Sequence, residues 1–254
     1  MASVDRQRHL PDEHWIIDGS SDAAIQRMLQ TEPQPLYRRW NSEPDGGISD
    51  AFNKGVRRCT GDIVHILNSG DYYPDPEVLS AVVAAFTEHP ERQWIHGQYY
   101  QYTGGRWRLT GAPMKRRQLY RGMAKIGHPT MFVRRTLYER YGLFRTDYRY
   151  AMDYDFLLRI AGEHYAWLKR PLSVFTPGGA SQGSRQALRA FDESQRAYRE
   201  RIGGDRRLPL RRLQVRCMLQ LTDWLAYTRR RLNPNRDAEG AATPAPTEHF
   251  AQQP

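Results

Sequence analysis

The stretch "SEPDGGISDAFNKGVRRCTGDIVHILNSGD" (residues 42–71) decides the predicted fold. Its first apolar residues recur at the spacing of one helical face, namely Ile48, Ala51, Phe52, Gly55 and Val56. The Thr60-Gly61 pair ends this helix, and the apolar segment "DIVHILN" that follows is typical of a short buried strand. The strand runs into a turn that closes at Asp71. The stretch therefore predicts a loop, a helix and a strand that end on a single carboxylate.

The flanking sequence repeats this alternation of strand and helix. Upstream, "HWIIDGSSD" predicts a strand over residues 15–17, a turn that begins at Asp18, and a helix over residues 23–29. The connector "TEPQPLYRRW" is rich in proline. Downstream, Asp75 is placed to cap a helix that has Pro76 at its first position and a stripe of apolar residues over 79–86. Strand, helix, strand, helix predicts an α/β fold with a parallel sheet.

The second half predicts mixed strands and three helices. "QWIHGQYYQY" and "RWRLTG" read as strands joined by a turn at Gly104-Gly105, and "TMFVRR" as another strand. A helix begins near Asp153, and a charged helix covers 184–201. We expect one α/β domain over 1–204, a basic amphipathic helix within 205–233, and a disordered tail over 234–254.

Composition limits the class of protein. The 254 residues are 39% hydrophobic, enough for a sizeable core, and 38 Lys and Arg against 28 Asp and Glu give a net charge of +10. That excess favours an anionic partner: a nucleotide, a nucleic acid or a lipid headgroup. Cys59 and Cys217 are too few for a disulfide framework. With no bilayer-spanning apolar run and no signal-peptide core, the sequence predicts a cytoplasmic protein, soluble or peripheral at the inner face of the cell membrane.

Two carboxylates follow predicted strands, Asp18 and Asp71. Ligands of open α/β sheets bind outside the carboxyl ends of the strands. A carboxylate in such a turn is suited to hold a divalent cation that also binds phosphate oxygens. The alternative for each residue is that it caps a turn or a helix.

Several motifs together carry a family resemblance. "WIIDGSSD", "SEPDGGISDAFNKGVRRCTGD" and "LNSGDYYPDPEVL", followed by "HPTMFVRR", "YGLF", "MDYDFLLR" and a weaker "GGAS", resemble family 2 glycosyltransferases of the GT-A fold over residues 13–182. The similarity is greatest to bacterial enzymes that build exopolysaccharides such as colanic acid. The resemblance implies a Rossmann-like, mixed and mostly parallel sheet flanked by helices, here with a C-terminal helical extension.

The resemblance also implies a donor site. Asp18 and Ser20 are expected to contact the donor nucleotide, and Asp71 fills the last acidic place of the metal motif, which reads Asn68-Ser69-Gly70-Asp71 here. One strong anionic ligand therefore remains for Mg²⁺ or Mn²⁺.

Three further residues belong to the same block: Asp50, Asn53 and Lys54. They share one helical face and are candidates for donor binding. The alternative is a solvated face with an Asp50–Lys54 pair at i, i+4.

The acceptor half offers a candidate base. Asp153 matches the position from which the family's catalytic base reaches the acceptor hydroxyl, with helix capping as its alternative role. Asp155 is the competitor, and because two positions on a helix face different ways, only one of them can face the cleft. His128 could contact the acceptor or a phosphate, or be structural. Arg159 could meet the diphosphate or form a salt bridge.

Two absences complete the comparison with the family. No Gln-x-x-Arg-Trp motif follows Asp153, which favours single additions over processive synthesis. The family normally opens with an apolar strand and a helix before "IDG", whereas "ASVDRQRHLPDEHWIID" resembles only the tail of that helix. Either the chain start is set too far downstream, or this is a truncated copy with an incomplete donor site.

The resulting expectation is an inverting, metal-assisted transfer of a sugar from a nucleotide-diphosphate sugar to a saccharide or lipid-linked acceptor. Eight arginines between Arg206 and Arg231 favour docking on an anionic membrane, with a solvated helix as the alternative. Other classes are a remnant that has lost turnover and, from the interleaved Tyr and Arg over 98–121, a nucleic-acid binder. No nucleic-acid module is recognisable, so no nucleic acid is expected.

Overall fold

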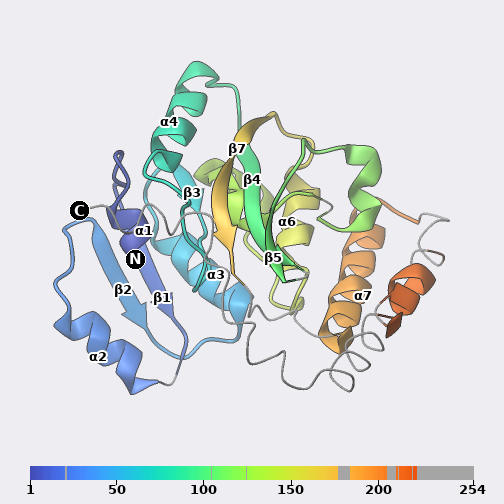
Figure 1. Cartoon of the computed structure of the whole chain (residues 1–254), viewed down its shortest axis with the longest axis horizontal. Coiled ribbons are helices and arrows are strands. Elements are labelled where there is room, and N and C mark those ends of the chain that lie inside the picture. Colours follow the sequence, from blue (N-terminus) through green and yellow to red (C-terminus); the bar gives the residue numbers. More distant parts are fainter. Residues whose placement is uncertain are drawn as a thin grey trace.

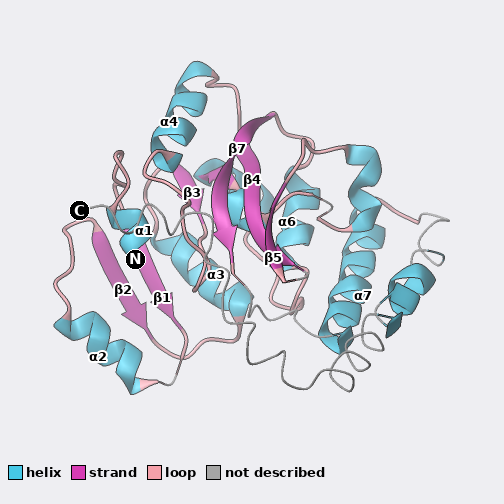
Figure 2. Cartoon of the chain, viewed as in Figure 1, coloured by secondary structure: helices cyan, strands magenta, loops and turns pink. Residues whose placement is uncertain are grey.

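The computed structural model describes residues 1–20, 22–103, 105–123, 125–176, 184–204, 210, 212–218 and 220–221. Figures 1 and 2 show an α/β arrangement in which helices surround two groups of strands. The strands are β1 (His14–Asp18), β2 (Arg38–Ser42), β3 (Ile63–His65), β4 (Trp94–Thr103), β5 (Arg106–Thr110), β6 (Phe132–Arg134) and β7 (Tyr165–Phe175). The helices are α1 (Ala2–Asp5), α2 (Ala23–Thr31), α3 (Ile48–Arg58), α4 (Val78–Glu88), α5 (Arg135–Tyr141), α6 (Met152–Ile160) and α7 (Ser184–Arg201), with 3₁₀ turns η1 (Arg116–Arg121) and η2 (His128–Thr130).

The strands form two sheets. β1 and β2 pair in parallel, and a larger sheet has the order β3-β6-β4-β5, with β7 parallel to β4. The other pairings, β3 with β6 and β4 with β5 and β6, are antiparallel. The mixed character expected from the sequence is therefore present, but the strands are not mostly parallel: three of the five pairings among the described strands are antiparallel, and each of these involves a strand of the second half.

Most predicted elements are present, with one boundary corrected. The predicted strands, the 48–58 helix and the 184–201 helix match β1, β3 to β6, α3 and α7. The expected cap at Asp75 is wrong by two residues: α4 begins at Val78 with Glu77 as its N-cap. The Asp75 carboxylate instead accepts hydrogen bonds from the Glu77 N–H and from Arg170 of β7, both at 2.8 Å.

Two strands were absent from the sequence-based prediction. β2 lies in the stretch interpreted as a proline-rich connector, and its buried Arg38 pairs with Asp5 of α1. β7 carries the interruption Lys169-Arg170-Pro171, and proline and charge argue against a central strand. The β4–β7 ladder shifts register next to this interruption, between Gly97 and Tyr99, so an irregular ladder accommodates the proline.

Two apolar clusters hold the domain together. One, centred on α6, α5 and β6, includes Trp94, Leu137 and Leu157, each without exposed surface. The other joins α4 to the opposite side of the large sheet through Val78, Val82 and other apolar residues. Helices pack on both faces of the larger sheet around β3, β6 and the start of β4, which fixes the strand ends that carry the candidate site, whereas β5 forms an exposed edge.

Two strand edges face one cavity. Among the described residues, β1 pairs only with β2 and β3 only with β6. Glu13, just before β1, accepts hydrogen bonds from the N–H groups of Thr60 and Gly61, just before β3, at 2.8 and 3.0 Å. The two strands therefore begin side by side, and Figure 1 shows the β1–β2 pair apart from the larger sheet. The cavity is lined by residues of both strands, among them Trp15 of β1 and Val64 of β3.

The C-terminal predictions are described only in part. Residues 210, 212–218 and 220–221 are helical, as expected for the basic amphipathic segment. The rest of that segment and the 234–254 tail lie outside the described residues. Within the described part of the chain, none of the helices combines the length and the apolar character needed to cross a membrane.

Candidate active site

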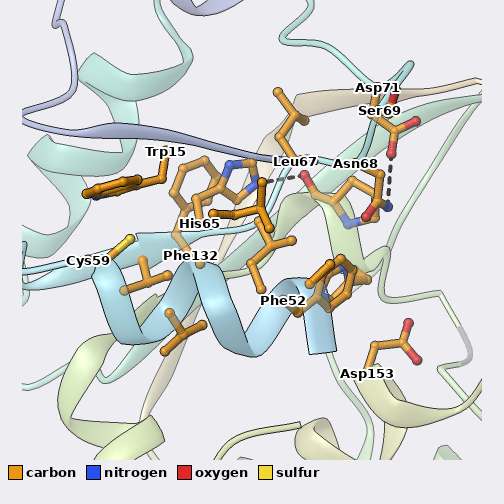
Figure 3. Close-up of a pocket in the computed structure, with 18 of the residues that line it drawn as sticks. Trp15, Phe52, Cys59, His65, Leu67, Asn68, Ser69, Asp71, Phe132 and Asp153 are labelled. Carbon is orange, nitrogen blue, oxygen red and sulfur yellow. Dashed lines mark hydrogen bonds between the residues drawn. The ribbon is translucent and has the colours of Figure 1, made fainter. Parts of the chain in front are cut away.

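The candidate site is a cavity of about 1330 Å³. The apolar face of α3 forms one wall through Phe52 and Val56, and residues of β1, β3 and α4 form others. Its polar groups gather where β1, β3 and β7 end and where α6 begins. In Figure 3, the carboxylates of Asp71 and Asp153 lie at one end of this cavity, and Trp15 and Cys59 lie at the other.

Asp18 organises the turn after β1. Its carboxylate accepts hydrogen bonds from the Ser20 N–H at 3.0 Å and from the Ser42 hydroxyl, at the end of β2, at 2.8 Å. Burial raises the pKa of Asp18, but these hydrogen bonds outweigh burial and hold the pKa below its ordinary value. Gly19 and Ser20 line the cavity, whereas the Asp18 side chain is 8% exposed. Asp18 therefore shapes the turn that presents Ser20, and its own contact with a donor stays a prediction.

A further carboxylate, which the sequence reasoning missed, lies beside this turn. Asp45 lines the cavity, and its Oδ1 accepts a hydrogen bond from the Gly47 N–H at 2.8 Å. A Cβ added at Gly19 would lie 1.5 Å from Asp45 Oδ2, so the Asp45 carboxylate packs directly against the Gly19 backbone and would have to move for any larger residue. Its place in "EPDGG", at the start of the deciding stretch, was the signal in the sequence.

Asp71 is held at the end of the large sheet. Its Oδ1 accepts a hydrogen bond from the Thr176 N–H at 3.0 Å, and its Oδ2 accepts one from Asn68 Nδ2 at 3.3 Å, which Figure 3 marks. Burial raises the pKa of Asp71 to about 6, against the opposing effect of these hydrogen bonds. Gly70 has φ +91° and packs on Thr176, so the turn before Asp71 requires glycine. Asp71 is therefore ionised at neutral pH and protonated in mild acid.

The donor set is compatible with one kind of metal site. Among the described residues, no group of three or more His, Cys, Asp or Glu side chains could hold a metal ion. Mg²⁺ commonly binds through one or two carboxylates and takes its other ligands from water and substrate phosphates. Asp71 is half-buried in the cavity wall, so it fits this mode of binding, in which water and substrate phosphates supply the other ligands. It does not fit a site built from protein ligands alone.

The α3 candidates fall mostly outside the cavity wall. Asn53, expected at the donor, is 3% exposed and exchanges two hydrogen bonds with the backbone of Phe144, at 2.8 and 2.9 Å. Both ends of its amide are engaged by this backbone and Asn53 is absent from the cavity wall, so the structure shows a role in holding the Phe144 loop, and contact with a donor stays a prediction. Lys54 lies 3.5 Å from Asp50 and donates to the Pro44 carbonyl at 2.8 Å. The i, i+4 pair of the alternative is therefore present, but it is only partly solvated: the Lys54 and Asp50 side chains are 15% and 30% exposed, and Asp50 also accepts a hydrogen bond from the Gly46 N–H at 3.0 Å.

The start of α6 separates the two candidate bases. Asp155 is fully buried and forms ion pairs of 3.0 Å with Arg159 and Arg201. Asp153 lines the cavity. Burial raises the pKa of Asp153, with the neighbouring His128 ring and the Tyr154 N–H acting in the opposite direction. Of the two carboxylates, Asp153 is the one placed to reach a ligand.

Of the two remaining candidates, His128 lines the cavity and Arg159 forms a salt bridge. His128 lines the cavity and stacks on Phe52, with ring centroids 5.3 Å apart. Burial lowers the pKa of His128 despite the nearby Asp153 carboxylate, so the imidazole is neutral at pH 7. Arg159 binds Asp155 and the carbonyls of Gly142 and Leu143, at 2.7 and 2.8 Å. The salt-bridge alternative holds for Arg159, and the diphosphate contact is corrected.

Other cavity residues carried only weak signals in the sequence. Arg149 and Tyr150 immediately precede α6, Tyr99 and Gln101 lie on β4, and Thr176 follows β7. Nearness to Asp153 could have indicated the first two. The others reach the cavity through the register of β4 and β7, which no local pattern specifies.

Comparison with known proteins decides the family. The sequence profile described as "Glycosyl transferase family 2" matches residues 1–143, more than half of the chain. The chain belongs to this family. An uncharacterised glycosyltransferase of Mycobacterium tuberculosis is 32% identical over 151 residues, 59% of this chain and 57% of that protein. A PGL/p-HBAD biosynthesis glycosyltransferase of Mycobacterium bovis is 31% identical over 160 residues, 62% of this chain and 61% of that protein. This family 2 chain thus spans roughly three fifths of the length of these curated relatives.

Solved structures identify the fold of this family 2 chain as GT-A. TarS of S. aureus (residues 1–349), in complex with UDP-GlcNAc, has a TM-score of 0.60 at 18% identity, covering 86% of this chain and 66% of that chain. The mannosyltransferase PcManGT of Pyrobaculum calidifontis, in complex with GDP-Man and Mn²⁺, has a TM-score of 0.58 at 17% identity, covering 98% of this chain and 72% of that chain. These similarities establish the fold.

Proposed function

We propose that this family 2 chain transfers a sugar, with inversion and in single additions, from a nucleotide-diphosphate sugar to a hydroxyl of a saccharide or lipid-linked acceptor. The reaction would serve synthesis of an exopolysaccharide or another cell-surface glycan. The observation that carries the proposal is that Asp153 and Asp71 line one cavity, whereas the competing Asp155 is locked into ion pairs. Neighbours that bind UDP-GlcNAc, or GDP-Man with Mn²⁺, support a donor of this class.

Asp153 is the base of the proposed reaction. Its carboxylate takes the proton of the acceptor hydroxyl as that oxygen forms a bond to the anomeric carbon. The bond from that carbon to the diphosphate breaks on the opposite face, and its electron pair leaves with the nucleoside diphosphate. Burial makes Asp153 a stronger base than an exposed aspartate, because the charged form is poorly solvated. Neutral His128 and the ring of Phe52 shape the wall beside it.

Asp71 and the turn of Ser20 form the donor end. Asp71 would hold Mg²⁺ or Mn²⁺, which supplies charge neutralisation for the departing diphosphate. The Ser20 turn lines the same cavity, where it would meet the nucleotide. Much of the rate would come from holding donor and acceptor in line.

The test separates binding from transfer. Binding of UDP-GlcNAc and GDP-mannose with MnCl₂ is measured by calorimetry, and turnover by release of UDP or GDP with water or octyl glycosides as acceptors. Asp153→Asn is expected to keep the donor affinity and lower kcat by about 10²- to 10⁴-fold. Asp50→Asn is the matched control, a carboxylate paired with Lys54 outside the cavity wall. Full turnover in Asp153→Asn would remove Asp153 as the base.

A second candidate is a protein that binds the donor without turning it over. Within the described residues, β1 pairs only with β2 and β3 only with β6, and the cavity that both strands line could hold a donor whether or not Asp153 acts as a base. Donor affinity that depends on Asp71, with no nucleoside diphosphate released by the wild-type chain, would support this candidate over the enzyme.

We also propose that the C-terminal helix docks on the anionic, cytoplasmic face of a membrane, where a lipid-linked acceptor would be presented. An ion pair between Arg212 and Asp192 of α7 (2.7 Å) and buried Val215 anchor one side of the helix. Its other side exposes an apolar stripe, namely Leu210, Leu213, Met218 and Leu221, each 55–61% exposed. An exposed apolar stripe with flanking arginines is the pattern of an interfacial helix.

Vesicle flotation tests this docking. The full chain is expected to float with phosphatidylcholine vesicles that contain phosphatidylglycerol and to stay unbound with pure phosphatidylcholine. Leu213→Glu with Leu221→Glu should abolish flotation, whereas Leu109→Glu, an exposed leucine on β5, should not. Flotation unaffected by the double substitution would contradict the proposal.

A further inference from the structure

A carboxylate from α7 holds the segment that leads into α6. Glu193 Oε2 accepts hydrogen bonds from three consecutive backbone N–H groups, those of Arg149, Tyr150 and Ala151, at 3.0, 2.7 and 3.1 Å. α6 and α7 pack side by side, as Figure 1 shows. One side chain from a distant helix therefore binds a whole turn of backbone.

This contact holds the backbone that enters α6. The three N–H groups belong to Ala151, the N-cap residue of α6, and to the two residues before it. Ala151 has no side chain able to accept a hydrogen bond. Hydrogen bonds to a carboxylate are about twice as strong as neutral ones, and a negative charge is favourable at a helix N-terminus. Glu193 thus fixes the path of the chain into the first turn of α6.

The segment held in this way carries the candidate chemistry. Arg149 and Tyr150 line the cavity, and Asp153 lies two residues beyond Ala151. Glu193 itself is absent from the cavity wall and belongs to a helix outside it. Any effect of Glu193 on a ligand must therefore pass through the backbone of 149–151.

We propose that Glu193 is a positioning residue for the base Asp153, an inference that rests on the proposed function. By binding the three N–H groups, Glu193 sets the position of the Asp153 carboxylate relative to the donor end of the cavity. Its loss frees the turn, and a displacement of about 1 Å between reacting groups can lower a rate by about 10²-fold.

The experiment compares Glu193 with a carboxylate that is equally well bonded. Glu200, on the same helix, accepts from Arg145, Arg196 and Tyr148 at 2.6–2.9 Å but does not touch the 149–151 backbone. Glu193→Ala, Glu193→Gln and Glu200→Gln are made in the full chain. Release of UDP or GDP from UDP-GlcNAc or GDP-mannose gives kcat, calorimetry gives donor affinity, and thermal unfolding gives stability.

We expect Glu193→Ala to lower kcat about 10²-fold with donor affinity changed less than about threefold, a free-energy change of under 1 kcal/mol. Glu193→Gln, whose amide oxygen still accepts, should recover part of the loss. Glu200→Gln should lower the unfolding temperature with kcat kept. Equal kcat values in Glu193→Ala and Glu200→Gln would overturn the proposal.

The titration of Asp153 supplies a readout that a purely structural role would not move. In Glu193→Ala, Asp153 gains access to water, so its pKa should fall toward the ordinary value, and the acid limb of the kcat profile should move to lower pH. Carboxyl ¹³C NMR detects the same shift without turnover. If the Asp153 titration is unchanged in Glu193→Ala, the positioning role of Glu193 is overturned, and the Asp153→Asn variant still tests the proposed function. If Asp153→Asn is fully active, both the role of Asp153 as base and the role of Glu193 are overturned.

Discussion

The backbone N–H of Thr176 donates a 3.0 Å hydrogen bond to Asp71 Oδ1, which ties the end of β7 to the turn after β3. The candidate metal ligand is thus oriented by a strand that lies a hundred residues later in the chain. Burial raises the pKa of Asp71 to about 6 although the Thr176 hydrogen bond acts in the opposite direction, so Asp71 titrates close to neutral pH.

Binding of metal and donor should therefore depend on pH through Asp71. A metal ligand must be deprotonated, and Asp71 takes up a proton as the pH falls through about 6. We expect the affinity for Mn²⁺ with UDP-GlcNAc or GDP-mannose to be constant above pH 7 and to fall about tenfold per pH unit below 6. Calorimetry from pH 5 to pH 8 measures it. Asp71→Asn should show weak binding at every pH, and a flat profile in the wild type would contradict the assignment.

Stability without metal should show the opposite dependence. The pKa of Asp71 is higher in the folded state than its unfolded value of 3.8, so the folded state binds the proton more tightly. The free energy of unfolding should therefore decrease as the pH rises from about 4 to 6. Asp71→Asn, which keeps an acceptor for Thr176, should be more stable than wild type at pH 7.5 by on the order of 1 kcal/mol after allowing for partial exposure. The difference should vanish at pH 4 in thermal melts with EDTA.

Asp155 should matter for stability far more than Asp50. Removing one partner of a buried ion pair leaves the other charge uncompensated, and Arg159 beside Asp155 is almost fully buried. We expect Asp155→Asn to lower the free energy of unfolding by about 3–5 kcal/mol in urea titrations. Asp50→Asn, at a partly exposed pair with Lys54 and with an amide oxygen that can still accept from the Gly46 N–H, should change it far less. A mild Asp155→Asn variant with lost donor binding would instead place Asp155 at the ligand.

Asn53 should act through the loop that it binds. Asn53→Ala leaves the buried N–H and carbonyl of Phe144 without their side-chain partner, which should cost about 1–3 kcal/mol of stability. Donor affinity, measured below the unfolding transition, should stay at the wild-type value. Ser49→Ala, on the same helix with a single 3.4 Å bond to the Tyr148 carbonyl, is the milder control. Donor affinity lost without a fall in stability would restore the original expectation for Asn53.

Local patterns predicted most of the N-terminal half because their signals are periodic. The apolar stripe of α3 and the short strand after it need only neighbouring residues to be recognised. β2 and β7 were not predicted because each contains residues that are unusual in a strand. The buried Arg38 of β2 is accommodated by its ion pair with Asp5, and Pro171 of β7 is accommodated by the irregular ladder with β4.

The sequence by itself determined the family, most strands and helices of the N-terminal half, and the carboxylates that follow β1 and β3 or begin α6, because each is encoded within one short segment. Only the tertiary structure decided which of these side chains reach the cavity. Packing engages three of the candidates with other protein groups, namely Asp155, Asn53 and Arg159. Asp153 instead lines the cavity, and the backbone just before its helix is bound by Glu193, which lies 42 residues after Ala151 in the sequence. Such pairings depend on how helices pack, and no spacing along the chain encodes them.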